Sequence, residues 1–191
     1  WVDSRYWVQA EAELAGTDIT LMKIGVATDP AHTNWLAAQL PKGATVAVDG
    51  RALGLAARDA LLALLTPAGI HLKLDLDLPG LCWPERPLLP TAAVRDLPLK
   101  IAGASRQDKL ARVREAMLEQ GAQWHLISTL DDAAWLLNLR GSDVSFNPVF
   151  LSHVLIGLTD AQLFVLPGKV DAALSSKLAE AQVYVRPYDM V

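Results

Sequence analysis

Three polar side chains that could bind a ligand lie within eight residues in the second half of the chain. Arg140, Asp143 and Asn147 fall between two apolar runs, in the sequence LDDAAWLLNLRGSDVSFNPVFLSHV of residues 130–154. Binding residues are common on loops that a rigid scaffold holds at the surface, so this segment is the first candidate for a binding site. A structural alternative stays open on spacing alone, in which Asp143 caps a turn, Arg140 pairs with it and Asn147 begins a strand.

The four histidines do not form a recognisable metal site. His32, His71, His125 and His153 are widely spaced, and the sequence contains neither HExxH nor a His-x-His pair. His125 lies in an apolar run beside Trp124, where a core or edge histidine is the expected role. The sequence therefore predicts no catalytic residue and no metal ligand.

Other chemistries lack their patterns as well. The lone cysteine, Cys82, has no partner for an internal disulfide and is expected to be a packed small residue instead of a nucleophile. The segment from Gly103 to Ser105 lacks the glycine spacing and the Lys-Ser/Thr end of a phosphate-binding loop. Asp131 and Asp132 stand at a helix start, where the helix dipole alone explains two carboxylates.

Composition narrows the class of partner and the compartment. The chain has 191 residues, of which 52% are hydrophobic and 20% charged, as is ordinary for a soluble globular protein. A net charge of −4 without a basic cluster disfavours nucleic acid and anionic membranes as partners. No apolar stretch reaches the length that spans a bilayer. The lone cysteine fits a reducing compartment, so a cytoplasmic location is expected.

Strands and helices alternate along the chain, which predicts an α/β protein with a mixed sheet in each of two parts. A proline-rich stretch at 79–98 predicts an extended, stiff link, so the two parts are placed at 1–90 and 99–191. Ser105 with Asp108, and Thr129 with Asp132, have the spacing of capping boxes. The first of these boxes begins a helix that is predicted to end at Gly121. Further helices are predicted at 10–14, 29–40, 52–65 and 171–181. Strands are predicted at 19–24, 45–48, 70–78, 124–127, 154–156, 163–166 and 183–185, and the strand at 124–127 is expected to be buried.

A weak internal repeat links the two parts. Residues 164–169, a helix and residues 183–186 parallel residues 2–5, a helix and residues 19–23. This register predicts the later half of one domain followed by the earlier half of a second domain of the same kind. The chain also starts at Trp1 without an initiator methionine, so we expect a piece of a longer protein. Incomplete sheets would leave open edges, which favours association with missing strands or with a second copy.

Five segments in collinear order resemble one enzyme family. WLLNLRGSDVSFNPVF at 135–150 is similar to the second-domain signature of Xaa-Pro aminopeptidases of the three-domain type, which have a creatinase-like front and a "pita-bread" metallopeptidase domain behind it. The other similarities are DSRYW at 3–7 to the family's "DGRY", with Ser4 in place of glycine, LMKIG at 21–25 to "LMKxG", WPERP at 83–87 to "W..RP", and AGAS at 102–105 with Lys109 to the start of the second domain.

The resemblance implies two creatinase/prolidase N-terminal-like domains, or parts of them, without the catalytic domain. In the family, two divalent metals held by Asp, Asp, His, Glu and Glu of the C-terminal domain carry out hydrolysis, so this segment should be inactive alone and hold no cofactor, with manganese expected in the missing domain. Its partners would be that domain, a peptide with proline at the second position, and a second copy. Arg140, Asp143, Asn147 and His153 would face the substrate cleft, where a guanidinium held in direction by Asp143 could bind a peptide carbonyl or carboxylate.

Two alternatives remain at this point. A chain that keeps the creatinase-like fold without a peptidase would act as a binding or dimerisation module. A relative with another substrate, such as a dipeptidase or a creatinase-type hydrolase, would share the fold. The "LMKxG", "W..RP" and "NLRGSDVxxNPV" similarities favour the aminopeptidase.

Overall fold

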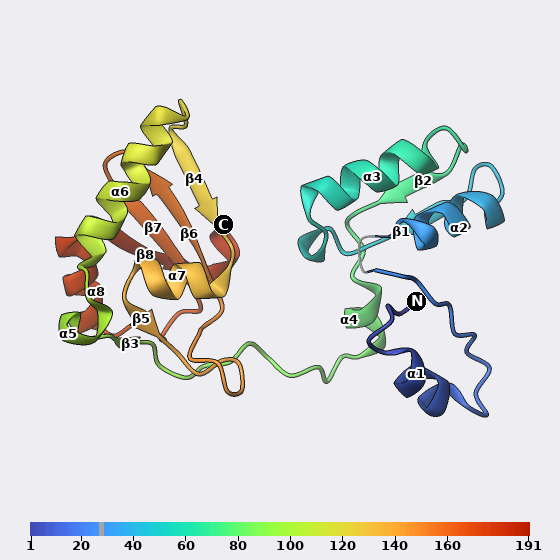
Figure 1. Cartoon of the computed structure of the whole chain (residues 1–191), viewed down its shortest axis with the longest axis horizontal. Helices are drawn as coiled ribbons and strands as arrows, with labels where there is room; N and C mark the ends of the chain where they lie inside the picture. The colour runs from blue at the N-terminus through green and yellow to red at the C-terminus, as the bar shows by residue number, and fades with distance from the viewer. Residues whose placement is uncertain (27–28) are drawn as a thin grey trace. The chain divides into compact units, whose positions relative to one another are not determined.

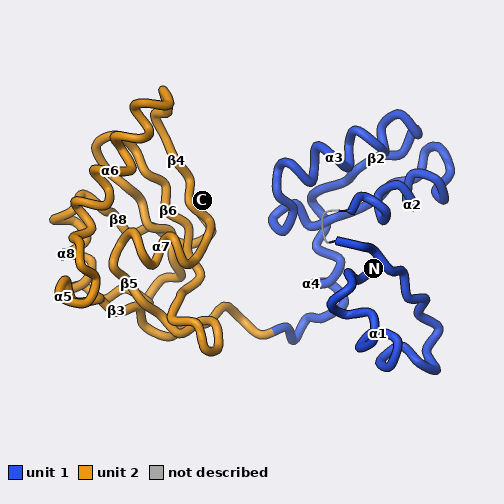
Figure 2. The backbone as a smooth tube through the Cα atoms, viewed as in Figure 1, with its two compact units in different colours: residues 1–86 blue, residues 87–191 orange. Residues whose placement is uncertain are grey.

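The structure is a computed structural model that describes residues 1–26 and 29–191. The chain divides into two compact units, unit 1 at Trp1–Arg86 and unit 2 at Pro87–Val191 (Figure 2). Each unit has its own helices and strands, and each is described by itself (Figure 1). Among the residues that the structure describes, no helix is both long and apolar enough to cross a membrane.

Unit 1 is built on a short parallel β-α-β motif. Strands β1 (Thr45–Ala47) and β2 (His71–Lys73) pair in parallel, with helix α3 (Leu55–Leu65) between them in sequence. Helix α2 (Ala31–Gln39) packs on α3, and the small buried core consists of Leu61, Leu65 and Ile70. The remaining elements of unit 1 are helix α1 (Trp7–Leu14), the 3-10 turn η1 (Gly50–Ala52) and helix α4 (Leu78–Cys82).

Two strands expected in unit 1 are shorter than their sequence patterns suggest. Residues 19–24 form only one parallel bridge, between Lys23 and Val2, and the alternating run at 70–78 forms three residues of β2. A strand extends only as far as a neighbouring strand accepts its hydrogen bonds, and β1 is itself three residues long. Val2 and Lys23, which lie on either side of α1 in the sequence, form a parallel bridge. The strands on either side of α8 in unit 2, Ala161–Val165 and Val183–Pro187, also pair in parallel, which is the arrangement that the predicted repeat requires.

The proline-rich stretch is not uniformly extended. Helix α4 starts where the side chain of Asp77 accepts a hydrogen bond from Gly80 N at 2.8 Å. Proline is tolerated in the first turn of a helix because its nitrogen needs no partner there. Further on, Val94 is buried in the core of unit 2, so this part of the stretch packs as an element of that unit.

Unit 2 contains a four-stranded mixed sheet in the order β4-β6-β7-β8. The first two pairings are antiparallel, and β7 and β8 pair in parallel across helix α8. A second, two-stranded sheet joins β3 (Arg95–Asp96) to β5 (Leu139–Arg140). The bounds are β4 Trp124–Ile127, β6 Ser152–Gly157, β7 Ala161–Val165, β8 Val183–Pro187, α5 Leu99–Ala102, α6 Arg106–Glu119, α7 Leu130–Leu136, α8 Ala172–Glu180 and η2 Tyr188–Met190.

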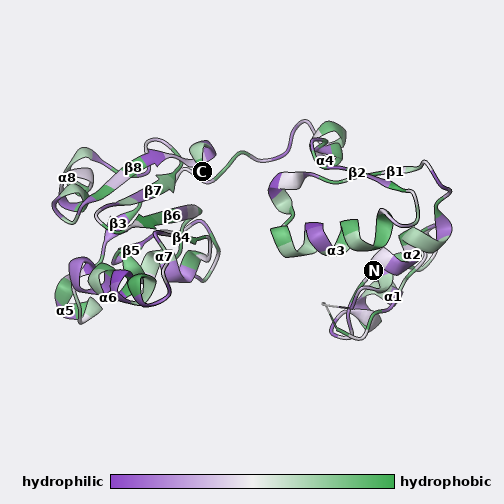
Figure 3. Cartoon of the chain, turned by 90° about the horizontal axis from the view of Figure 1, so that it is seen from above, coloured by the Kyte–Doolittle hydropathy of each residue, from purple (hydrophilic) through white to green (hydrophobic). Residues whose placement is uncertain are grey.

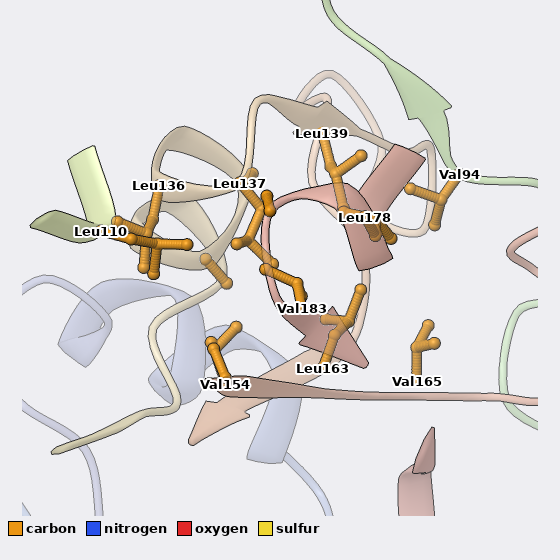
Figure 4. Packing of buried hydrophobic residues seen from close by; sticks show 14 of the residues in the cluster. Val94, Leu110, Leu136, Leu137, Leu139, Val154, Leu163, Val165, Leu178 and Val183 are labelled. Carbon is orange, nitrogen blue, oxygen red and sulfur yellow. The ribbon is translucent and has the colours of Figure 1, made fainter. Parts of the chain in front are cut away.

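Helices α6, α7 and α8 share one hydrophobic core with the sheet. Leu110 of α6, Leu136 of α7 and Leu178 of α8 belong to the same buried cluster as Val154 and Leu163 of the strands (Figure 4). The helix α6 alternates hydrophilic and hydrophobic residues around its axis, as expected for a helix that covers a sheet (Figure 3). Unit 2 therefore has the α/β architecture predicted from the sequence.

The caps are only partly as predicted. Ser105 Oγ accepts a hydrogen bond from Asp108 N at 3.0 Å and starts α6 as expected. Thr129 is the N-cap residue of α7, but its side chain makes no capping hydrogen bond, so the predicted second capping box is absent. Strand β4 lies where it was predicted but is not buried, because it is the edge strand of the sheet.

Candidate functional site

Asp143 is the anchor of the candidate loop, and its partner is Lys169. The Lys169 ammonium forms an ion pair with the Asp143 carboxylate, at 2.6 Å from Oδ2, and both side chains are almost completely buried, at 1% and 0% exposure. Leu151 N also donates to Asp143 Oδ2 at 2.8 Å, and Lys169 Nζ donates to Pro90 O at 3.1 Å. The expected pairing of Asp143 with Arg140 is therefore wrong, and Asp143 does not orient that guanidinium.

Sequence reasoning missed Lys169 because the pair spans 26 residues. Spacing patterns identify partners within a helix turn or a short loop, whereas this pair forms only when β7 brings the Pro167–Gly168 turn beside the loop. The available signal was the position of Lys169 between an apolar strand and Val170. A lysine in such a position is either exposed at a turn or buried with a carboxylate as its partner.

Arg140 turns toward backbone carbonyl groups instead. Its NH1 donates to Ala134 O at 2.9 Å and to Leu139 O at 2.8 Å, and the side chain is half-buried. These bonds use one nitrogen of the guanidinium. A guanidinium has five N–H donors, so Arg140 keeps further donors for a ligand oxygen. Its position at the end of β5 is held by pairing with Arg95 of β3.

Besides Lys169, a second lysine is buried in this region, Lys109, and it lies close enough to Arg140 to feel its charge. Lys109 Nζ donates to Asn138 Oδ1 at 2.6 Å and to Trp135 O at 2.8 Å, and it stands 4.3 Å from the centre of the Trp135 ring. Burial lowers the pKa of Lys109, and the positive charge of Arg140 lowers it further. Sequence reasoning noted Lys109 only as part of a resemblance. The available signal for this contact was a lysine on the inward face of α6 together with an asparagine, Asn138, just after the next long helix.

Asn147 lies in the exposed tip of the loop, beside Phe146. Asn147 N donates to Val144 O at 3.2 Å, which closes the tip as a tight turn. Phe146 is fully exposed and has a φ of +64°. A left-handed backbone is costly for a bulky side chain, so the loop holds this aromatic ring in solvent against local strain.

His153 is placed on the sheet and not in the loop. It lies in β6, half-buried, and a hydrogen bond of 2.8 Å joins its Nδ1 to Ser128 Oγ. Its ring is 5.3 Å from the ring of Tyr188 in η2. In the described part of the chain, no hydrogen bond or ion pair joins any two of Arg140, Asp143, Asn147 and His153, so the structure does not assemble the four candidates into one bonded site.

In unit 1, the segment DSRYW forms a local ion pair. Arg5 NH2 lies 2.7 Å from Asp3 Oδ2, and Arg5 N also donates to Asp3 Oδ1 at 3.1 Å. The side-chain hydrogen bonds from Arg5 lower the pKa of Asp3 to about 2. Ser4 is not among the described residues with a left-handed backbone, so a serine fits where the family pattern has glycine.

The described residues contain no group of three or more His, Cys, Asp or Glu side chains that could hold a metal ion. The residues present therefore do not fit a metal centre in this part of the chain. What the geometry offers is a half-buried guanidinium with spare donors, an exposed aromatic tip and a buried ion pair that holds the loop between them. Such an arrangement can bind or position a ligand.

The architecture of unit 2, a mixed sheet with helices packed on it, is that of creatinase/prolidase N-terminal domains. The family model described as "Creatinase/Prolidase N-terminal domain" matches residues 85–191, so the chain belongs to this family. The predicted family resemblance and the predicted α/β class are confirmed.

The relatives found by sequence are named as aminopeptidases. Xaa-Pro aminopeptidase 1 of Dictyostelium discoideum is 36% identical over 200 residues, which cover all of this chain and 32% of that protein. Aminopeptidase P2 of Arabidopsis thaliana is 34% identical over 194 residues, covering all of this chain and 27% of its own length. The chain therefore spans about a third of the length of the curated relatives that it matches.

A solved structure agrees with this assignment. The crystal structure of X-prolyl aminopeptidase from Caenorhabditis elegans, described as a cytosolic enzyme with a di-nuclear active site, matches 99% of this chain with a TM-score of 0.91 and 27% identity. The match covers 31% of the nematode chain.

Proposed function

We propose that this chain is the non-catalytic N-terminal region of a metal-dependent aminopeptidase that removes the first residue from peptides with proline second. The observation that carries the proposal is the end-to-end match of both units to about a third of enzymes named for this activity. In this proposal the two units are the later part of one creatinase-like domain and the earlier part of a second. A cytoplasmic location is part of the proposal and rests on the description of the nematode enzyme.

The metal would be held outside this chain. The relative with a solved structure has a di-nuclear site, whereas the described residues here offer no cluster of metal ligands. The missing two thirds of the enzyme would therefore supply the ligands, and manganese is the proposed metal. A bound metal would supply an activated water for hydrolysis of the bond before proline.

The role proposed for the candidate loop is to border the substrate cleft. Arg140 keeps free guanidinium donors, which suit a peptide carbonyl or carboxylate, and Asn147 stands exposed at the tip. Asp143 would act by holding the loop through Lys169, and His153 would face the catalytic domain from the sheet. Contacts between copies of the enzyme are a further proposed role of the region.

The test compares hydrolysis of an Xaa-Pro-Xaa peptide with added Mn²⁺ by this chain and by the longer polypeptide that includes a peptidase domain. We expect activity in the longer form alone, its loss with a chelator, and no cleavage when alanine replaces proline. Cleavage of dipeptides only would instead indicate a dipeptidase, and activity of the isolated chain would overturn the non-catalytic role. Light scattering of both forms reports the oligomer.

The cleft role has its own test in the longer enzyme. Arg140→Ala should raise KM or lower kcat about tenfold or more, because it removes a charge-assisted hydrogen bond to the substrate. The matched control is Arg58→Ala, since Arg58 is half-exposed in unit 1 and pairs with its neighbour Asp59. Wild-type kinetics on short and long peptides in Arg140→Ala would show that the loop does not contact substrate.

A further inference from the structure

Two arginines lie directly opposite each other in the two-stranded sheet of unit 2. Strands β3 and β5 run antiparallel, and their register pairs Arg95 with Arg140 (Figure 1). Val94 and Leu139, the sequence neighbours of these arginines, belong to the buried core of the unit (Figure 4). Side chains alternate between the two faces of a strand, so both arginine side chains leave the strands on the face away from the core.

The two arginines have like charges in a position where such charges repel each other. Side chains directly opposite in an antiparallel pair have Cβ atoms about 4.5–5.5 Å apart, and like charges there destabilise the sheet. Arg95 is exposed, and among the described residues its side chain forms no hydrogen bond or ion pair. The guanidinium of Arg140 donates to the carbonyl oxygens of Ala134 and Leu139. In residues 1–26 and 29–191, no carboxylate forms an ion pair with either arginine.

The acid closest in sequence is engaged on the other face. Asp96 lies opposite Leu139 in the ladder, so its side chain points to the covered side of the strands. There its carboxylate forms ion pairs with Arg106 and, at 3.3 Å, with Lys177. The two arginines on the outer face therefore receive no countercharge from their own strands.

Lys109 adds a third positive charge on the buried side of Arg140. It is only 3% exposed, and its hydrogen-bond acceptors, Trp135 O and Asn138 Oδ1, are neutral. Burial lowers the pKa of Lys109 and the charge of Arg140 lowers it further, whereas no carboxylate in the described part of the chain raises it. The carbonyl groups at the end of α7 offset only part of the charge of these cations.

The guanidinium of Arg140 is already oriented for a ligand. Its NH1 bonds to two backbone carbonyl groups, which leaves the edge formed by Nε and NH2 without a partner among the described residues. A guanidinium edge with two N–H groups can donate to two oxygens of one anion at once. A donor that is held in place before binding loses less conformational entropy when the ligand arrives. Arg95 can approach the same anion from the opposite strand.

We propose that Arg95 and Arg140 form a binding site for a phosphate group that bridges their two guanidinium groups, with Lys109 adding positive charge from the buried side. A phosphate group carries a charge of about −1.5 to −2 at pH 7 and three strong acceptor oxygens. A carboxylate carries a single charge and two oxygens, which one guanidinium already satisfies. Two facing guanidinium groups and a third cation therefore favour phosphate over carboxylate.

Calorimetric titration of the 191-residue chain with inorganic phosphate at constant ionic strength tests the proposal. We expect binding to the wild-type chain, and affinity at least about tenfold lower in Arg95→Ala, because one of two charge-assisted contacts is lost. Arg95→Ala should fold normally, since the side chain bonds to no other described residue. Arg58→Ala is the matched control, because Arg58 pairs with Asp59 in unit 1 and should not affect phosphate.

Two further ligands and one further variant test the chemistry of the site. Acetate should bind at least about tenfold more weakly than phosphate, because it carries one charge and two oxygens. Arg95→Glu should abolish phosphate binding, since a glutamate opposite Arg140 supplies the missing countercharge itself. O-phosphoserine identifies the source of the phosphate group. Affinity equal to that of inorganic phosphate or higher indicates a phosphate monoester as the ligand, and lower affinity indicates the free ion.

Three results would overturn the proposal. Equal phosphate affinity in the wild type and Arg95→Ala would show that the arginine pair is not the site. Equal affinity for acetate and phosphate would show that the site does not select a phosphate group. Binding that is present in the 191-residue chain and absent in a longer polypeptide with a peptidase domain would show that an acidic residue of that polypeptide occupies the arginine pair.

The inference goes beyond the proposed function and does not depend on it. Phosphate binding that requires Arg95, in a longer polypeptide that does not hydrolyse Xaa-Pro peptides, would refute the function and leave the phosphate site intact. Hydrolysis together with equal phosphate affinity in the wild type and Arg95→Ala would refute the phosphate site alone.

Discussion

The buried ion pair of Asp143 and Lys169 gives the sharpest expectation at the scale of single residues. Asp143→Asn removes the countercharge of an ammonium that is only 1% exposed. We expect a loss of about 3–5 kcal/mol in the free energy of unfolding, because an unpaired buried charge remains. Urea unfolding followed by circular dichroism measures this loss. The control is Asp59→Asn, whose pair with Arg58 is exposed and should contribute about 0–1 kcal/mol.

The double variant distinguishes a stabilising pair from a merely tolerated one. Asp143→Leu with Lys169→Met removes both charges together, and it should recover most of the stability lost in Asp143→Asn. A stability loss in the double variant as large as in the single one would mean that packing of the loop, and not the uncompensated charge, decides the effect.

The lowered pKa of Lys109 leads to a prediction of how the free energy of unfolding changes with pH. Burial and the nearby Arg140 lower its pKa in the folded chain below the ordinary 10.5, so the unfolded chain binds more protons between the two values. The free energy of unfolding should therefore rise with pH across this window relative to that of Lys109→Met. Unfolding measured at several pH values for both proteins gives the difference. A flat difference would mean that Lys109 titrates normally.

Phe146 links local strain to the proposed cleft. Asparagine tolerates a left-handed backbone far better than phenylalanine, so Phe146→Asn should leave stability unchanged or raise it by up to about 1 kcal/mol. In the longer enzyme the same change should reduce activity if the exposed ring serves the substrate. Val8→Asn is the control, since Val8 is 81% exposed on α1. Unchanged activity would mean that the ring has no part in catalysis.

For single residues, the sequence indicated which side chains are unusual but not which residues they contact. Arg140, Asp143 and Asn147 stood out because polar residues interrupted an apolar pattern. The partner Lys169 depends on the pairing of β6 with β7, which no local spacing encodes. Strand pairing between distant segments is what a single sequence leaves undetermined.

At the scale of elements, the cap of α6 is the clearest case. Ser105 accepts a hydrogen bond from Asp108 N, so Ser105→Ala should cost about 1 kcal/mol of unfolding free energy. Ser176→Ala is the matched control, because Ser176 lies within α8, where its hydroxyl donates to Ala172 O and caps nothing. Equal effects of the two changes would contradict a capping role.

Elements that satisfy their own hydrogen bonds were predicted best. Helices α3, α6 and α8 lie within a few residues of their predicted bounds, since helix periodicity and caps are local. The strands at 19–24 and 70–78 were overestimated because alternation reports a half-buried face and not the presence of a neighbour. The burial of β4 was misjudged for a related reason, since an apolar strand reads alike at the centre and at the edge of a sheet.

The whole molecule consists of two units with cores of very different size. The buried cluster of unit 2 includes residues from three helices and from the strands β6, β7 and β8, with Ile127 of β4 packed against it, whereas that of unit 1 is Leu61, Leu65 and Ile70. Burial of apolar side chains is the main favourable term in folding. Unit 1 should therefore open more readily than unit 2.

Hydrogen exchange followed by mass spectrometry measures this difference in the 191-residue chain. Peptides from β6, β7 and α8 should exchange more slowly than peptides from β1, α3 and β2. Each tenfold difference in exchange rate corresponds to about 1.4 kcal/mol in the free energy of local opening. Asp143→Asn supplies the decisive comparison, because it weakens the core of unit 2 alone. If the units open independently, protection falls in unit 2 and stays constant in unit 1. A parallel fall in both would mean that the two units unfold as one cooperative body, and the smaller core of unit 1 would then draw its stability from unit 2.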